Sequence, residues 1–158
     1  MSDLDLAYLA GVIDSDGYIT VHRSVRNGKA YHAARIGIAG TRRQPHDLAA
    51  SLWGGKVSRY EPKDPRHRVQ YQWSRTGDKA AVAITKIQPY LRVKQEQAHI
   101  ALEVQEHVIF GRGPNPYPWM PADYDPEPLF INLRDQVVRV LNQDRRAAWD
   151  QMPVPSAV

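Results

Sequence analysis

The sequence predicts an α+β fold in which helices and strands follow the order αββαββα, with additional helices at the C-terminal end. Two segments alternate apolar and polar residues on either side of an Asn-Gly dipeptide, which is typical of an antiparallel hairpin. A second pair of strand-like segments follows later in the chain. Each pair is preceded by a segment with helical spacing of its apolar residues.

The first helix is predicted over residues 3–14, and its apolar residues recur at near-helical spacing: Leu6, Leu9 and Ile13. Ser2 is a candidate N-cap, and Asp5 three positions later completes a capping box. We expect the helix to end at Ser15-Asp16-Gly17, where Gly17 can take a positive φ.

A strand is predicted over residues 18–26, with apolar Ile19, Val21 and Val25 on one face. Asn27-Gly28 then turns the chain into a return strand near residues 31–39. On this return strand, Ile36 and Ile38 are expected to face inward.

The second half repeats the order of helix, strand and strand before the terminal helices. The predicted helices and strands cover residues 44–52, 56–60, 66–74, 78–90, 95–110 and 129–150. Six of the 12 prolines fall within residues 114–128, which excludes a helix there and predicts a loop.

Basic residues concentrate in the middle of the chain, although the net charge of the 158 residues is only +4. Residues 42–95 carry 12 Lys and Arg against 4 Asp and Glu, whereas residues 96–158 carry 5 against 9. Such a distribution predicts one positively charged face, which attracts a polyanion. Charge alone leaves a solvated surface without function equally open.

Composition excludes several classes of protein. The chain has no cysteine, which excludes disulfide frameworks, zinc ribbons and thiol nucleophiles. No apolar run approaches the roughly 20 residues of a membrane span, so no membrane association is expected. We expect a soluble intracellular protein, in a bacterial or phage cytoplasm or in an organelle.

The segment Leu9-Ala10-Gly11-Val12-Ile13-Asp14-Ser15-Asp16-Gly17 places a carboxylate just beyond a helix. Ala10 and Gly11 are small enough to let two such helices approach closely. A calcium-binding EF-hand loop does not fit, because it would put Val12 at the first ligand position and Arg23 at the last.

The same nine residues closely resemble the signature of the LAGLIDADG homing endonucleases. The segment from Pro89 to Ala98 resembles the one that carries an active-site lysine in single-motif members, and Lys94 falls on that position. Leu133-Arg134-Asp135-Gln136 and Leu141-Asn142 resemble their C-terminal helices. The resemblance implies a saddle-shaped antiparallel sheet within one domain over residues 1–152, a Pro-rich loop at 111–128 and a flexible tail at 153–158.

The resemblance further implies a catalytic site built around Asp16 and Lys94. Many relatives carry a glutamine at the end of the second strand to position a water, whereas this neighbourhood reads Ala39-Gly40-Thr41-Arg42-Arg43. Thr41 is a candidate for orienting the water, and Arg42 or Arg43 for the basic group near the phosphate.

Asp16 and the backbone carbonyl of Ser15 are the metal ligands that the resemblance implies. An oxygen-rich site without cysteine suits Mg²⁺ better than Zn²⁺. We expect Mn²⁺ to substitute, Ca²⁺ to support binding without cleavage, and no small-molecule cofactor to be needed.

A chain with one motif holds half of a two-helix interface, so a symmetric homodimer on a pseudo-palindromic DNA target is expected. The residues expected at the dimer interface are Leu9, Ala10, Gly11 and Ile13.

DNA is expected to meet the polar side of the sheet, because a β-ribbon fits the major groove of double-stranded DNA. The predicted DNA-binding residues are Thr20, His22, Ser24, Arg26, Arg35, Lys56, Ser58, Tyr60, Arg68, Gln70 and Gln72.

These features predict a homodimeric, Mg²⁺-dependent, site-specific endonuclease that cuts both DNA strands. Two other functions remain open on the same scaffold: a catalytically inactive DNA-binding protein and an RNA maturase that assists intron splicing. A sheet-based transcriptional regulator is a third alternative, and it would bind DNA without regard to divalent metal.

Overall fold

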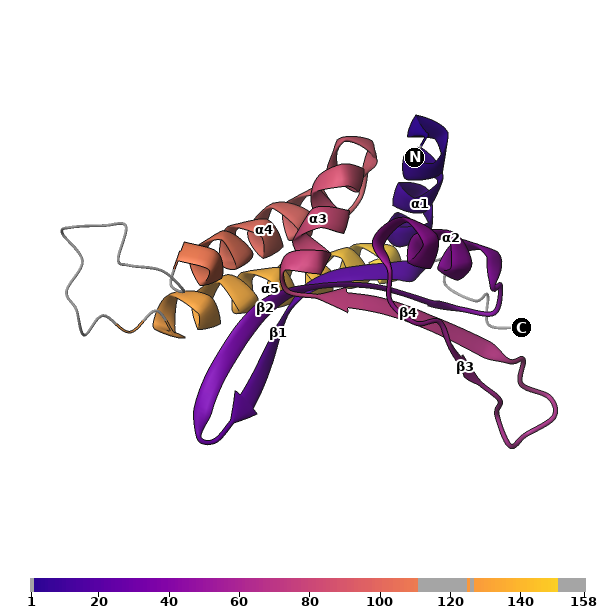
Figure 1. The fold of residues 1–158 in the computed structure, drawn as a ribbon, viewed down its shortest axis with the longest axis horizontal. Helices are drawn as coiled ribbons and strands as arrows, with labels where there is room; N and C mark the ends of the chain where they lie inside the picture. Colours follow the sequence, from indigo (N-terminus) through magenta and orange to yellow (C-terminus); the bar gives the residue numbers. More distant parts are fainter. Residues whose placement is uncertain (1, 111–124, 126, 151–158) are drawn as a thin grey trace.

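The computed structural model describes residues 2–110, 125 and 127–150. Four antiparallel strands form one sheet in the order β1-β2-β4-β3, and the helices cover one side of it (Figure 1). The elements are α1 (Asp3–Asp16), β1 (Gly17–Arg26), β2 (Lys29–Gly40), α2 (Gln44–Trp53), β3 (Ser58–Tyr60), β4 (Gln70–Thr76), α3 (Asp78–Ile87), η1 (Gln88–Tyr90), α4 (Gln95–Phe110) and α5 (Glu127–Asp150). The predicted α+β class and the αββαββα order with C-terminal helices are confirmed.

Helix α1 begins with the predicted capping box. The backbone N–H of Asp5 donates to Oγ of Ser2 at 3.1 Å, and the Asp5 carboxylate accepts from Ser2 in return. The predicted end of the helix is wrong in one respect: Gly17 is extended, with φ of −98°, and has no positive φ. Gly17 is instead required by close packing, because a Cβ there would lie 2.8 Å from the Gly37 oxygen and from Cα of Ile13.

Replacement of Gly17 with Ala is therefore expected to destabilise the protein. Both backbone neighbours are fixed within a helix and a strand, so one of them must shift; overpacking of this kind costs about 1–3 kcal/mol. Urea unfolding measures the loss. Gly40→Ala is the matched control, because its nearest contact would be the His46 ring at an ordinary 3.9 Å. Equal stability of the two variants would contradict the packing argument.

The hairpin of β1 and β2 turns at the predicted Asn27-Gly28, which have φ values of 52° and 75°. Arg26 pairs with Lys29 and Gly17 pairs with Ile38, so the register continues without interruption along the whole hairpin. Near the turn the arm projects beyond the helices, and Val25 is 57% exposed. Val25 lies on the same face as Ile19 and Val21, as predicted, but it is not buried, because no helix covers this end of the strand.

Strands β3 and β4 are displaced from their predicted ranges. Lys56 and Arg68 lie in the segments that precede the strands, and not within them. In the loop between the strands, Asp64 accepts hydrogen bonds from the backbone and the guanidinium of Arg66, at 3.0 Å and 2.7 Å. Such local bonds compete with hydrogen bonding between strands, and β4 begins only at Gln70.

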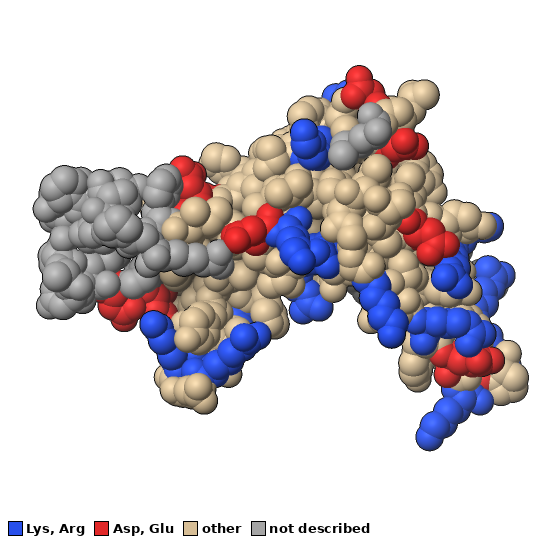
Figure 2. Space-filling model, in the orientation of Figure 1, with Lys and Arg blue, Asp and Glu red and all other residues tan. Residues whose placement is uncertain are grey.

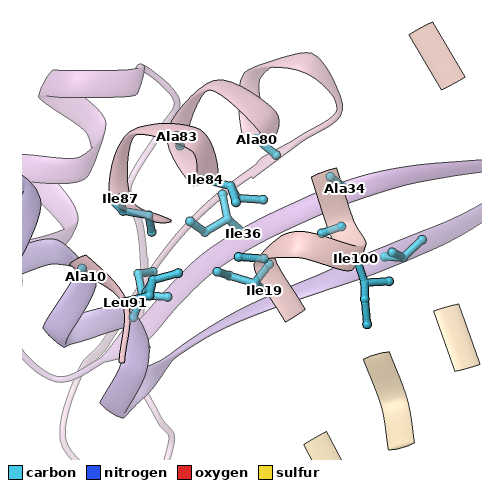
Figure 3. Close-up of a cluster of buried hydrophobic side chains, with 14 of the residues drawn as sticks. Ala10, Ile19, Ala34, Ile36, Ala80, Ala83, Ile84, Ile87, Leu91 and Ile100 are labelled. Atoms are coloured by element: carbon cyan, nitrogen blue, oxygen red, sulfur yellow. The ribbon is translucent and has the colours of Figure 1, made fainter. Parts of the chain in front are cut away.

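The core lies between the helices and the sheet. Ile19 of β1 and Ile36 of β2 are fully buried and belong to one hydrophobic cluster with Ile84 and Ile87 of α3, where Ile36 lies beside Ile84 (Figure 3). The predicted inward orientation of Ile36 and Ile38 is confirmed.

Helix α5 packs against α4 and against the back of β1. It begins at Glu127, two residues before the predicted start and inside the expected Pro-rich loop, with Pro128 in its first turn, where a missing N–H costs nothing. Arg23 of β1 forms an ion pair with Glu127 at 3.1 Å, and the ring of His32 lies 5.4 Å from that of Phe130. These contacts tie the arm of the hairpin to the C-terminal helix.

Burial of His32 lowers its pKa below the ordinary 6.5; Glu127 opposes this effect, while Arg23 and Arg134 add to it. The unfolded chain therefore takes up a proton at His32 as the pH falls through about 6.5, before the folded chain does, and stability falls. We expect the free energy of unfolding to decrease from pH 7.5 to pH 5.5, and to decrease less in His32→Leu. Urea unfolding at both pH values, with the exposed His67→Leu as control, measures this. An identical pH dependence of wild type and His32→Leu would contradict it.

Within the described residues, no helix is both long and apolar enough to cross a membrane. The predicted tail at 153–158 and most of the Pro-rich loop lie outside the described residues.

Candidate active site and nucleic-acid interface

Asp16 is the last residue of α1 and lines a cavity of about 460 Å³ between α1, the end of β2 and the start of α2. Tyr8 and Val12 form the α1 wall of this cavity, and Thr41 and Arg42 lie on the opposite side. The end of α1 and the residues after β2 therefore bring the Asp16 carboxylate, the Thr41 hydroxyl and the Arg42 guanidinium to one cavity.

The structure separates the two candidate arginines. Arg42 lines the cavity, and Nδ1 of His46 lies 2.8 Å from its carbonyl oxygen, which anchors its backbone. Nε of Arg43 instead donates to the Asp47 carboxylate at 3.1 Å, and its guanidinium lies 5.9 Å from the centre of the Tyr71 ring. Arg42 therefore joins the Asp16 cavity, whereas Arg43 is engaged outside it.

Oxygen atoms gather at the C-terminal end of α1. The Asp16 side chain is exposed, and the carbonyl groups of the last turn have no acceptor role within the helix. The hydroxyl of Ser15 donates backwards to the carbonyls of Gly11 and Val12, at 3.0 Å and 3.2 Å, which turns this side chain back along the helix; the backbone carbonyl of Ser15 is a further oxygen next to Asp16. One carboxylate and one carbonyl oxygen form a hard donor set that fits Mg²⁺.

No group of three or more His, Cys, Asp and Glu side chains comes together in the part of the chain that the structure describes. A cation at Asp16 would therefore need further oxygen ligands from water, phosphate or a second chain.

Lys94 immediately precedes α4, and its ammonium Nζ donates to the backbone carbonyl of Asp14 at 2.6 Å. The cavity wall does not include it. The Asp14 carboxylate accepts hydrogen bonds from the backbone N–H of Arg92 and of Lys94 itself, at 2.7 Å and 3.0 Å. The lysine is thus fastened to the end of α1, two residues from Asp16.

The uncovered face of the sheet carries most of the predicted DNA-binding residues. Pairing places Thr20 opposite Arg35, Ser58 opposite Gln72, and Tyr60 opposite Gln70, all on the side away from the core. His22, Ser24 and Arg26 follow on the same side of β1. The sheet arches beneath the helices, and Lys and Arg side chains gather along its lower side over both projecting arms (Figures 1 and 2).

Solved structures with a similar arrangement include several homing endonucleases. The chain is 21% identical to I-CvuI, determined in complex with its target in the presence of Ca; the match covers 87% of this chain and 82% of that one, with a TM-score of 0.63. The archaeal intron-encoded I-Vdi141I, complexed with DNA, matches over 85% and 97% with 14% identity and a TM-score of 0.55. I-TnaI matches over 90% and 99% with 13% identity and a TM-score of 0.56.

The chain has the fold of the LAGLIDADG homing endonucleases. No protein-family model and no curated protein matches the sequence.

Within this LAGLIDADG fold, the motif helix α1 has two different sides. Leu9, Ala10 and Ile13 are at most 1% exposed and pack into the core of their own chain, so the prediction that they contact a second copy is corrected. The exposed side holds Leu4, which is 82% exposed, and Tyr8, which is 51% exposed. Gly11 also lies on it, and a Cβ added there would meet nothing within 4 Å.

Sequence reasoning missed two aromatic residues on the uncovered face of the sheet. Tyr31 pairs with Ser24, is 48% exposed, and lies 5.8 Å from Nζ of Lys29. Tyr18 lies across Gly37, where any Cβ would overlap its ring, and it supports the guanidinium of Arg35 at 5.8 Å. The two-residue turn at Asn27-Gly28 was the available signal, because it fixes which residues of β2 share a face with those of β1.

Proposed function

We propose that the protein is a site-specific, divalent-metal-dependent endonuclease that cuts both strands of DNA as a homodimer. The observation that carries this proposal is the Asp16 cavity, where an exposed carboxylate, Thr41 and Arg42 meet beside a polar, uncovered sheet face. DNA in the solved structures of I-CvuI and I-Vdi141I supports the same class of ligand here.

The sheet face supplies DNA recognition in this proposal. A β-ribbon fits the major groove, and residues of one parity on β1, such as His22 and Arg26, project from it towards base edges. Exposed Gln70 and Gln72 of β4 add side chains with both donors and acceptors. Binding should weaken steeply with salt, since Lys and Arg release counterions from the phosphates.

Asp16 and the carbonyl oxygen of Ser15 would hold the metal, which when bound supplies positive charge to the phosphate under attack. The hydroxyl of Thr41 orients the attacking water, and the guanidinium of Arg42 stabilises negative charge that builds up on the phosphate oxygens. The ammonium of Lys94 adds a second positive charge from the other side of α1.

The exposed side of α1 supplies the dimer contact. Leu4, Tyr8, Gly11 and Ser15 recur at spacings of four, three and four, so they form one stripe along the helix. An exposed leucine and tyrosine are apolar surface that a second α1 can cover, and Gly11 lets the two backbones approach. Two-fold symmetry then places two Asp16 carboxylates near one another and requires a pseudo-palindromic target.

Incubation of the protein with a plasmid library of randomised palindromic half-sites tests the proposal. We expect double-strand cleavage with Mg²⁺ or Mn²⁺, binding without cleavage with Ca²⁺, and no cleavage with EDTA. Metal-independent binding without any cleavage would overturn the proposal and favour an inactive DNA-binding protein. Preference for structured intron RNA over every DNA in the library would favour a maturase.

Arg42 and Arg43 provide a matched pair of adjacent variants. Arg42→Ala is expected to slow cleavage about 10²-fold, the usual cost of removing one group that stabilises developing charge. Arg43→Ala should change it only slightly, because that guanidinium is already paired with Asp47 outside the cavity. Single-turnover rates on a selected site measure both. A larger effect of Arg43→Ala would contradict the assignment.

A further inference from the structure

The first carboxylate of the motif, that of Asp14, binds three successive backbone N–H groups. Its Oδ2 accepts from Arg92 at 2.7 Å and from Val93 at 3.2 Å, and its Oδ1 accepts from Lys94 at 3.0 Å. These groups belong to the segment just before α4, whose first-turn N–H groups have no partners within the helix. Hydrogen bonds to an ionised carboxylate are among the stronger ones in proteins.

Asp14 and Asp16 point in different directions because they are two positions apart on a helix with about 3.6 residues per turn. Asp16 is exposed and lines the cavity, whereas Asp14 is half-buried and faces the segment before α4. The two acids of the motif therefore cannot exchange roles.

Asp14 binds both the backbone and the side-chain ammonium of Lys94. Its backbone N–H is bound by the carboxylate of Asp14, and its Nζ donates to the Asp14 carbonyl at 2.6 Å. That carbonyl lies in the last turn of α1, where the helix dipole favours a cation. Without the carboxylate, the segment 92–94 would lose its three backbone hydrogen bonds to Asp14, and the backbone of Lys94 would no longer be fastened to the end of α1.

We propose that Asp14 is the positioning residue for Lys94: its carboxylate fixes the segment 92–94 on the end of α1, so that the ammonium is delivered to the Asp16 site. This inference rests on the endonuclease function proposed above. Asp14 itself touches neither DNA nor metal, and it acts through Lys94.

A double-mutant cycle on single-turnover cleavage of a library-selected site tests this coupling. Asp14→Asn keeps the size of the side chain but presents an amide to three N–H donors. We expect it to slow cleavage at least about tenfold, with the DNA dissociation constant unchanged within about twofold, because misplacement of a catalytic group by 1 Å costs up to about 10²-fold. In a Lys94→Met background, Asp14→Asn should have no further effect. If it slows that variant by the same factor as the wild type, the inference is overturned.

Asp5→Asn is the matched control, since it removes a carboxylate from the capping box at the other end of α1. It should lower stability without slowing cleavage; an equal slowing in both Asp variants would overturn a specific role for Asp14. If Asp14→Asn does not fold, Asp14→Ser, which keeps one acceptor oxygen, takes its place in the cycle.

An NMR measurement on the DNA-free protein separates this inference from the proposed function. In the wild type, we expect slow exchange of the backbone amides of Val93 and Lys94 and two distinct shifts for the ε protons of Lys94. In Asp14→Asn, the amides should exchange at least about tenfold faster and the two shifts should merge. Unchanged signals would overturn the inference even if the enzyme is active. If the signals change as expected but the protein cuts no member of the library, the positioning contact is upheld and the proposed endonuclease function is rejected.

Discussion

Replacement of Asp16 with Asn is expected to abolish DNA cleavage, by at least about 10³-fold, while the affinity for the target is retained. The variant keeps the shape of the side chain but removes the only carboxylate that lines the cavity in the described chain. A metal that stabilises the transition state contributes several kcal/mol, and each 1.36 kcal/mol corresponds to about tenfold in rate. Single-turnover cleavage with Mg²⁺, together with binding in Ca²⁺, measures both quantities.

A purely structural role for Asp16 would give a different result from loss of a metal ligand. Asp16 is exposed and lies outside the core, so its loss should leave urea unfolding unchanged. Asp5→Asn serves again as the control for cleavage, because it removes an equal charge from the opposite end of the same helix. Loss of binding and of folding stability together would mean that Asp16 is a structural residue and not a ligand.

Replacement of Gly11 with Leu is expected to leave the single chain folded and to abolish the dimer. Nothing in the chain lies within 4 Å of a Cβ at this position, and glycine within a helix is less favourable than other residues by about 0.5–1 kcal/mol. The isolated chain should therefore be as stable as the wild type or more stable. Where two α1 helices cross closely, however, the added side chain would force the backbones apart.

Sedimentation equilibrium and cleavage of the selected site measure this effect. We expect the variant to sediment as a monomer and to cut at least about 10²-fold more slowly, since half a site binds DNA weakly. Thr85→Leu on α3 is the control, because it adds a leucine to another exposed helical position. A Gly11→Leu variant that remains dimeric and active would exclude α1 as the contact between chains.

Local signals in the sequence were sufficient for most of the fold. The capping box at Ser2 and Asp5, the Asn27-Gly28 turn and the inward Ile36 each depend on neighbouring residues, and each is confirmed. Errors arose where tertiary contacts decide. Gly17 is small because Gly37 and Ile13 crowd it, and the contact with Gly37, 20 residues further along the chain, cannot be recognised from local sequence.

The candidate site was only partly predictable for the same reason. The resemblance pointed to Asp16, Thr41 and Arg42, and the structure brings them to one cavity. It could not show which side of α1 is buried, because apolar residues lie all around that helix: Leu9 and Leu4 are equally hydrophobic, yet they are 0% and 82% exposed. Asp14 escaped notice because its partners are backbone groups almost 80 residues away, which leave no pattern in side-chain sequence.

For the proposed endonuclease, the unbroken pairing of the long hairpin limits how new DNA targets can be acquired. Since side chains alternate between the two faces, a single inserted residue in either strand would turn His22 or Arg35 towards Ile19 and bring core residues to the outer surface. Exchanges of one amino acid for another leave that alternation intact. New target sequences can therefore be reached by substitutions along the β1–β2 hairpin, in evolution or in the laboratory. Insertion or deletion of a single residue in either strand would disrupt the sheet instead.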